Sequence, residues 1–188
     1  MKIAICIPVA SDGIIKAKTS LAIMNVIKKA KDYEVIPMFQ FGAYVFENRQ
    51  EMVFFAQLQK CSHIFFVDYD MIFDPEILNI LLSRNKDIIG VNYMMRKLPP
   101  RTTVLADEKE KITLDRLFKC HGIGMGVALI KMSVFDKISP PWFHFDFDER
   151  GRISVSEDYY FCNKARQEGY DIWVDPTIKV GHLGDYIY

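Results

Sequence analysis

The first half of the chain alternates short, continuous apolar runs with segments in which apolar residues recur at helical spacing. A continuous apolar run predicts a strand that is buried on both faces, as in a parallel sheet covered by helices. The predicted strands of this half are residues 2–9, 33–39, 63–71 and 87–93. Helical spacing predicts helices that begin at Ser20, close before Arg49 and at Asp74, where Pro75 suits the first helical position.

The order of these elements, β-α-β-α-β-α-β, predicts the fold class. Connections long enough to hold a helix imply parallel strands joined by right-handed crossovers. We therefore expect an α/β fold with a doubly wound, mostly parallel sheet and helices on both faces. The chain has 188 residues, of which 50% are hydrophobic, and this is enough for one domain with a sizeable core.

The second half of the chain has a less regular pattern. Its predicted elements are a short strand at 102–106, a charged loop at 107–111, a strand at 127–130, a short helix at 133–137, an aromatic and acidic loop or hairpin at 140–151, a helix at 156–169, and strands at 170–174 and 177–180. Gly169 suits the position just after the last helix. The final strand runs into a Gly-flanked histidine, His182.

The strand predicted at 63–71 ends in two carboxylates, Asp68 and Asp70, with Tyr69 between them. Residues two apart on a strand point to the same face, so we expect both carboxylates to enter the crevice beyond the carboxyl end of the sheet. Converging carboxylates repel each other and are best stabilised by a hard divalent cation such as Mg²⁺ or Mn²⁺. The alternative is a solvated acidic turn at the end of the strand.

Composition restricts the classes of partner. With 24 basic and 24 acidic residues, the chain has a balanced charge that argues against a general nucleic-acid or membrane-surface interaction. The four cysteines are far apart and have no CxxC spacing, which indicates reduced thiols rather than a zinc site. No apolar run is long enough for a signal peptide or a transmembrane segment. We therefore expect a cytoplasmic protein.

Several motifs occur in an order that resembles the GT-A-fold glycosyltransferases, particularly the large inverting family that includes cellulose synthases and its compact phage and bacterial versions. The motifs are IPVASD after the first strand, Asp68-Tyr69-Asp70, the segment GIGMGVALIK, the helix opening Ser156-Glu157-Asp158, and His182. Each motif alone is weakly specific, and the resemblance depends on their joint order over residues 2–184. It implies one glycosyltransferase domain over 1–188, with a nucleotide-binding half (1–95) and a half that serves the acceptor and the metal (96–188).

The resemblance implies a metal site. In the Asp-x-Asp motif of the family, Asp68 would contact the ribose or sugar of the donor and count among the metal ligands, and Asp70 would bind the divalent metal directly. His182 matches a third ligand, and an imidazole ligand favours Mn²⁺ over Mg²⁺. The metal would bind the donor diphosphate and stabilise the charge of the leaving group. Without this context, His182 is a polar residue at the end of a strand.

The resemblance also implies a catalytic acid motif in Ser156-Glu157-Asp158. Asp158 would be the base that takes the proton of the acceptor hydroxyl, with Glu157 beside it, and the family match favours reaction with inversion. A purely structural interpretation competes with this one. Serine is a favoured N-cap, and acidic residues in the first turn complement the helix dipole.

Two parts of the sequence match donor-binding segments of the family. Ser11 and Asp12 match the part that contacts the nucleotide base or ribose, although Asp12 beside Gly13 also fits ordinary turn chemistry. The Gly-rich segment precedes a strand instead of opening a helix, so it is not a dinucleotide fingerprint. Gly124 in this segment would let a sugar approach the backbone closely.

Two further features have open interpretations. Arg49 could reach a phosphate or the base of the donor, or it could pair with Glu47 or Glu51. Trp142 and Phe143 could stack on a carbohydrate, or they could anchor a loop in the core.

The segment 140–155 contains a second Asp-x-Asp sequence, Asp146-Phe147-Asp148. We discount it as a metal motif because no buried strand precedes it. From its composition, we expect the segment to order over the bound donor and exclude water.

The function expected from these observations is metal-dependent transfer of a sugar from a nucleotide-diphosphate sugar to an acceptor hydroxyl. UDP-sugar is the first choice of donor and GDP-sugar the second, and the acceptor is a saccharide, a lipid or a protein. One alternative is a non-catalytic module that binds a nucleotide sugar. The other is a sugar-nucleotide pyrophosphorylase, but VASDGIIKAK after the first strand is a poor match to the Gly-rich, basic signature of those enzymes.

Overall fold

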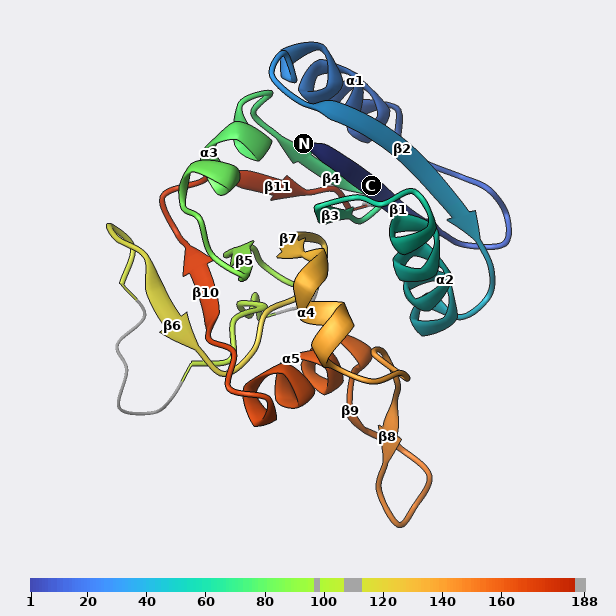
Figure 1. Cartoon of the computed structure of the whole chain (residues 1–188). Helices are drawn as coiled ribbons and strands as arrows, with labels where there is room; N and C mark the ends of the chain where they lie inside the picture. The colour runs from blue at the N-terminus through green and yellow to red at the C-terminus, as the bar shows by residue number, and fades with distance from the viewer. Residues whose placement is uncertain (97–98, 107–112, 185–188) are drawn as a thin grey trace.

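The computed structural model describes residues 1–96, 99–106 and 113–184. Its centre is a seven-stranded sheet with the strand order β2-β1-β3-β7-β5-β10-β6 (Figure 1). The strands of this sheet are β1 (Lys2–Val9), β2 (Glu34–Phe41), β3 (His63–Val67), β5 (Ile88–Val91), β6 (Phe118–Cys120), β7 (Val127–Lys131) and β10 (Ile172–Asp175). Two smaller sheets pair β4 (Met71–Phe73) with β11 (Val180–His182), and β8 (Asp146–Phe147) with β9 (Ile153–Val155).

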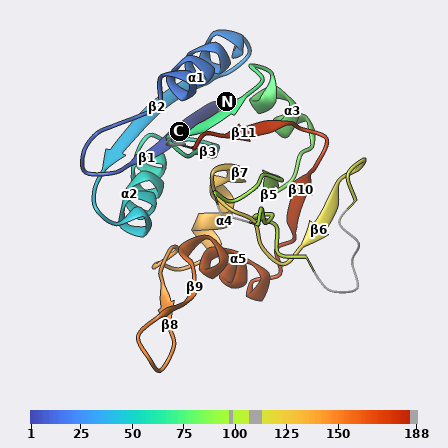
Figure 2. The same cartoon turned by 180° about the vertical axis from the view of Figure 1, so that it is seen from behind.

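Helices cover both faces of the central sheet, as predicted. They are α1 (Ala17–Lys29), α2 (Val45–Leu58), α3 (Ile77–Ser83), α4 (Met132–Lys137) and α5 (Glu157–Gln167). Two hydrophobic cores form, one with α2, α4 and α5 and the other with α1 and α3 (Figure 2). Strand β1 contributes Ala4 and Cys6 to the first core and Ile3, Ile5 and Ile7 to the second. A strand that is apolar on both faces is therefore buried on both faces, and the α/β prediction is confirmed.

The directions of the strands are mixed. Strands β2, β1, β3, β5 and β10 run one way, while β7 and β6 run the other way. The predicted parallel strands of the first half are present, but β7 lies between β3 and β5 and pairs antiparallel with both. Apolar periodicity reports that a strand is buried and does not report which strands it pairs with.

The strand predicted at 63–71 is in fact two strands with a turn between them. Strand β3 ends at Val67, where the N–H of Asp68 donates to the carbonyl of Gly126, and β4 begins at Met71. The N–H of Met71 donates to the carbonyl of Asp68 and closes the turn. Asp68 and Asp70 therefore lie in a turn, where the alternation of side chains along a strand does not apply, and they face different partners.

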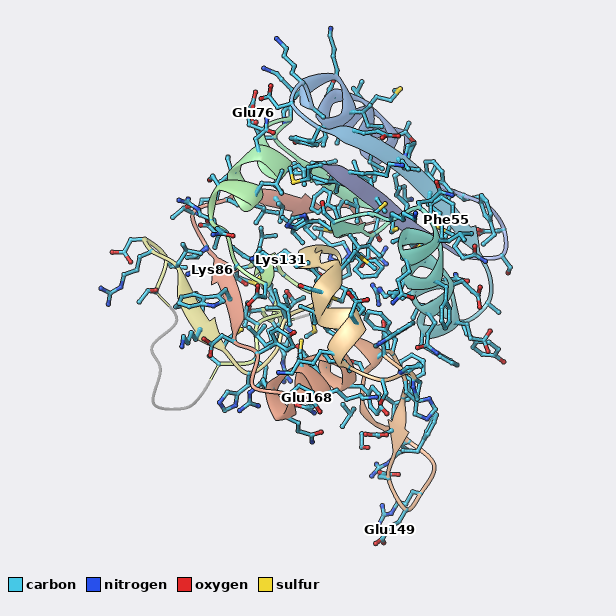
Figure 3. All side chains as sticks on the ribbon, viewed as in Figure 1. Phe55, Glu76, Lys86, Lys131, Glu149 and Glu168 are labelled. Carbon is cyan, nitrogen blue, oxygen red and sulfur yellow. The ribbon has the colours of Figure 1, made fainter. Side chains whose placement is uncertain are left out.

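The second half also differs from the sequence prediction in detail. Residues 102–106 form no strand and make isolated bridges at Thr102 and Leu105. The short edge strand β6 was not predicted. The predicted loop at 107–111 lies outside the described residues. The predicted hairpin in the segment 140–151 is present as β8–β9, and Glu149 lies at its far tip (Figure 3).

The open interpretation of Trp142 and Phe143 is settled in favour of a hydrophobic anchor. Both side chains are buried in the core. The Trp142 ring packs against Phe54 and Phe135 at centroid distances of 4.9 and 5.7 Å, and its Nε1–H donates to the carbonyl of Ile138 at 2.6 Å. Neither ring is available to stack on a carbohydrate.

The four cysteines are buried thiols, as expected. Within the described part of the chain, none of the helices combines the length and the apolar character needed to cross a membrane.

We expect Trp142→Ala to lower the free energy of unfolding by about 3–5 kcal/mol, because it removes a buried indole from a packed core. Urea denaturation measures the change. Phe147→Ala is the matched control: Phe147 lies in β8 with 59% of its surface exposed, so its loss should change stability by less than about 0.5 kcal/mol. Equal losses for the two variants would contradict the anchor role.

Candidate active site

A cavity of about 240 Å³ opens where β1 and β3 end. Its lining includes Val9, Gly42, Arg49, Asp68, Glu157 and Asp158. The carboxyl ends of the strands are the usual ligand site of open α/β sheets. A larger hollow of about 460 Å³ lies at α3 and residues 177–179, away from the predicted site residues. The smaller cavity is the candidate site because it brings three of the predicted carboxylates together.

Arg49 is the centre of this group of carboxylates. Its side chain is 2% exposed, its Nη2 donates to Oδ1 of Asp68 at 2.9 Å, and its Nη1 donates to Oε1 of Glu157. The same Nη1 lies 3.7 Å from Oδ1 of Asp158. The predicted ion pair with Glu47 or Glu51 is therefore wrong: the partners of Arg49 are Asp68, which directly follows β3, and residues at the start of α5. A contact of Arg49 with the donor stays a prediction.

Three carboxyl groups lie around this one guanidinium, and each of them is at least partly buried. Burial, the largest cause, and the charge of Asp158 raise the pKa of Glu157 to about 8, although Arg49 opposes the shift. Burial also raises the pKa of Asp68, again against the effect of Arg49. The cluster thus holds a proton more tightly than the same groups would in water.

Asp158 lies in the first turn of α5 and faces the cavity. Its Oδ2 accepts a hydrogen bond of 3.1 Å from the backbone N–H of Met125, in the Gly-rich segment. Ser156 is at the N-cap position, but within the described chain its side chain makes no capping hydrogen bond. Capping by the serine hydroxyl therefore does not account for the Ser-Glu-Asp motif, while the position of Asp158 suits a base.

Asp70 and His182 are brought together at the other end of the turn. Asp70 is 1% exposed, and its Oδ1 lies 3.4 Å from Nε2 of His182. Nδ1 of the histidine lies 2.9 Å from the carbonyl oxygen of Met94. Contact with Asp70, followed by the Met94 carbonyl, raises the pKa of His182 against the effect of burial. Nη1 of Arg96 lies 2.9 Å from Oδ2 of Asp70.

The residues around Asp70 fit a divalent cation. Both carboxylate oxygens are buried, and neither has a hydrogen-bond partner among the described residues. No group of three or more His, Cys, Asp or Glu side chains within the described ranges is arranged to bind a metal, and Oδ1 of Asp68 is taken by Arg49. Mg²⁺-type sites commonly use one or two carboxylates and complete their coordination with water and substrate phosphates. Asp70 with His182 matches such a site.

The other predicted donor contacts, Ser11, Asp12 and Gly124, are not among the residues that line this cavity. Ser11 and Asp12 are exposed beyond β1, and Oδ1 of Asp12 accepts the N–H of Ile14 at 3.1 Å, which is the turn chemistry that the sequence also allowed. A Cβ on Gly124 would collide with the Tyr93 hydroxyl, so the open side of this glycine is filled by protein. A sugar contact at Gly124 stays a prediction.

Sequence reasoning missed Tyr93 and Arg96. The buried hydroxyl of Tyr93 accepts the N–H of Gly126 at 2.9 Å, and its ring meets His182 edge-on at 5.5 Å between centroids. Tyr93 therefore positions both the Gly-rich segment and the histidine. The sequence did contain a signal for Tyr93, because it is an aromatic residue with a polar hydroxyl at the end of a predicted buried strand. Arg96 lies just beyond, in a segment without periodicity.

A cluster of aromatic rings lies beside the cavity. Phe46 on α2 contacts His144 and Phe145 at centroid distances of 6.0 and 5.4 Å, and His144 contacts Tyr160 on α5 at 5.6 Å. Tyr44, 5.8 Å from Phe46, is 57% exposed. The cluster joins the start of α2 to α5, the two helices that carry Arg49 and Asp158.

No protein-family model matches the sequence, and no curated protein matches it. Among solved structures, the crystal structure of A197 from STIV matches with a TM-score of 0.69 and 20% identity, over 98% of this chain and 87% of that one. The crystal structure of GalNAc-T7 with UDP, GalNAc and Mn²⁺ matches with a TM-score of 0.63 and 13% identity, over 96% of this chain and 43% of that one.

These similarities establish the GT-A fold predicted from the order of motifs. They do not point to the cellulose-synthase-like family within that fold. The chain spans less than half of the GalNAc-T7 chain, so it corresponds to one part of that protein.

The raised pKa of Glu157 predicts how stability depends on pH. A carboxyl whose pKa in the folded protein, about 8, lies above its ordinary value of 4.5 stabilises the fold below pH 4.5 and loses this contribution as the pH rises through 8. We expect Glu157→Gln, which cannot ionise, to remove part of this loss. Relative to the wild type, the free energy of unfolding of the variant should rise between about pH 4.5 and 8, by at most about 1.4 kcal/mol per pH unit, and the difference should level off above pH 8.

Urea titrations at several pH values measure this dependence. Glu149→Gln, at the exposed tip of the hairpin, is the control and should follow the wild type at every pH. A constant difference between Glu157→Gln and the wild type across the range would show that Glu157 is ionised throughout.

Proposed function

We propose that the protein transfers a sugar from a nucleotide-diphosphate sugar to an acceptor hydroxyl, with a divalent cation at Asp70 and His182. One observation carries this proposal: Asp70 is a buried carboxylate whose oxygens have no hydrogen-bond partner within the described residues, next to an imidazole and beside the cavity of Asp158. The GT-A fold, and the UDP and Mn²⁺ in the GalNAc-T7 structure, support it.

The cation would supply positive charge to the diphosphate as it leaves. The side chains of the chain itself perform the other tasks. The acceptor oxygen attacks the anomeric carbon, the bond from this carbon to the diphosphate oxygen breaks, and the acceptor proton passes to Asp158. Glu157, neutral up to about pH 8, adds no second negative charge beside the base. Arg49 lies 2.9 Å from Asp68 and 3.7 Å from Asp158, so it holds both carboxylates at the wall of the cavity.

The choice of ligands follows from the same residues. An imidazole ligand favours Mn²⁺ over Mg²⁺. UDP-sugar is the preferred donor and GDP-sugar the second, with Ser11 and Asp12 near the nucleotide. Reaction with inversion is favoured by the resemblance of Ser156-Glu157-Asp158 to the acid motif of the inverting glycosyltransferases. The aromatic cluster at Tyr44 and Tyr160 offers flat faces on which a saccharide acceptor can stack.

We expect Asp70→Asn to abolish the metal-dependent part of nucleotide binding. In a thermal-shift experiment, UDP with Mn²⁺ at 100 times the dissociation constant should stabilise the wild type by about 2.7 kcal/mol. The variant should show no difference between Mn²⁺ and EDTA. Asp146→Asn makes the same substitution in the other Asp-x-Asp sequence and should behave as the wild type. Metal-dependent stabilisation that survives in Asp70→Asn would exclude the proposed metal site.

We expect Asp158→Asn to slow the chemical step without weakening donor binding, because a base acts on the acceptor. Release of UDP from UDP-sugars, with water or a saccharide as acceptor, should fall by about 10²–10⁴-fold, while the thermal shift with UDP and Mn²⁺ is retained. Asp146→Asn again serves as the control.

The same assay separates the competing functions. Binding of UDP by the wild type without any turnover would favour the non-catalytic module. Consumption of nucleoside triphosphate with a sugar phosphate would favour the pyrophosphorylase.

A further inference from the structure

Asp70 already has a cationic neighbour, and this neighbour belongs to the protein. Nη1 of Arg96 lies 2.9 Å from Oδ2 of Asp70, and it also lies 3.5 Å from the carbonyl oxygen of Leu183. The two members of this pair differ greatly in exposure to solvent. The side chain of Asp70 is 2% exposed, whereas that of Arg96 is 42% exposed. The carboxylate is therefore fixed, and the guanidinium can move into solvent at little cost.

The guanidinium and a divalent cation cannot occupy the same side of Asp70. A bound Mg²⁺ or Mn²⁺ sits roughly 2 Å from its carboxylate oxygen, well inside the contact that Arg96 makes. Two positive groups at such a separation repel each other strongly where water is scarce. A metal held by Asp70 and His182 on the Oδ1 side would therefore lie close enough to the guanidinium at Oδ2 to drive Arg96 away from Asp70.

Once displaced from Asp70, the Arg96 guanidinium could bind the diphosphate of the donor. The diphosphate of the donor would lie next to the metal, and a planar guanidinium with its fork of N–H groups matches phosphate oxygens. Arg49 cannot serve in this way, because it is 2% exposed and is already bonded to Asp68 and Glu157. Arg96 is attached at the edge of the same site and keeps a long, flexible side chain.

We propose that Arg96 is the resident counterion of Asp70, that it gives up this carboxylate to the metal, and that it then binds the donor diphosphate. This inference rests on the proposed function. It makes Arg96 a positioning and specificity residue for a diphosphate ligand. It also couples the two ligands: metal alone binds weakly because it must displace Arg96 without compensation, while metal and diphosphate together give Arg96 a new partner.

The test uses the whole chain and measures two affinities separately. Mn²⁺ binding without nucleotide is followed by the electron paramagnetic resonance signal of free Mn²⁺, and UDP binding in the presence of Mn²⁺ is followed by calorimetry. We expect Arg96→Gln to bind Mn²⁺ alone about fivefold more tightly, because the competing cation is gone. The same variant should bind UDP with Mn²⁺ about tenfold more weakly, because a charge-assisted contact to the diphosphate is lost.

Opposite changes in the two affinities distinguish this role from a structural one, which would weaken both or neither. Arg96→Lys keeps the charge without the fork, so it should bind Mn²⁺ like the wild type and recover part of the UDP affinity. Arg150→Gln is the matched control, since Arg150 follows Glu149 at the far tip of the hairpin (Figure 3), and it should change neither affinity. Thermal unfolding of the apo variants checks that each one folds.

The results distinguish a failure of the Arg96 inference from a failure of the proposed metal site at Asp70. If Asp70→Asn loses Mn²⁺ binding but Arg96→Gln matches the wild type, or weakens Mn²⁺ binding, the inference about Arg96 is overturned and the proposed metal site stands. If the wild type and Asp70→Asn bind Mn²⁺ equally, or neither binds it, both proposals are wrong.

Discussion

The buried guanidinium of Arg49 joins parts of the chain that are far apart in sequence. Glu157 is 108 residues away from it, and both Asp68 and Asp158 lie within ion-pair distance. Taking a guanidinium out of water is costly, and its pairing with carboxylates offsets the cost only while those carboxylates stay in place. This one side chain on α2 therefore ties the end of β3 to the start of α5. The cavity between these two elements has its shape because Arg49 spans it.

The turn between β3 and β4 divides the site into two parts with different tasks. Asp68 points to Arg49 and belongs to the internal ion-pair group. Asp70, after one intervening residue, points to His182 and Arg96. An unbroken strand would have aimed both carboxylates at the same place. The break directs the first carboxylate to Arg49 and the second to His182 and Arg96, so the two carboxylates of this Asp-x-Asp motif have different surroundings.

The sheet and the covering helices could be predicted because burial leaves a local pattern in the sequence. The run at residues 64–67 is apolar on both faces and lies in the core on both faces. Less of the candidate site could be predicted from the sequence. The order of motifs indicated Asp70 and His182, and the structure brings these two residues together. The partners of Arg49 and the position of β7 could not be predicted, because long-range pairing leaves no periodic signal in either segment. Arg96 has no local pattern at all.

Asp70 is a buried carboxylate whose hydrogen-bond acceptors are not satisfied within the described residues. A buried carboxylate normally accepts several hydrogen bonds, and leaving it without them costs free energy. Arg96 supplies positive charge and Nε2 of His182 lies 3.4 Å from Oδ1, but neither oxygen has a hydrogen-bond partner within the described residues. Folding alone gives no reason to keep a carboxylate in this state, since an apolar or amide side chain of similar size would avoid the cost. A cation that coordinates oxygen directly would satisfy the lone pairs that these neighbours do not, and it would do so at the edge of the sheet where a diphosphate can reach it.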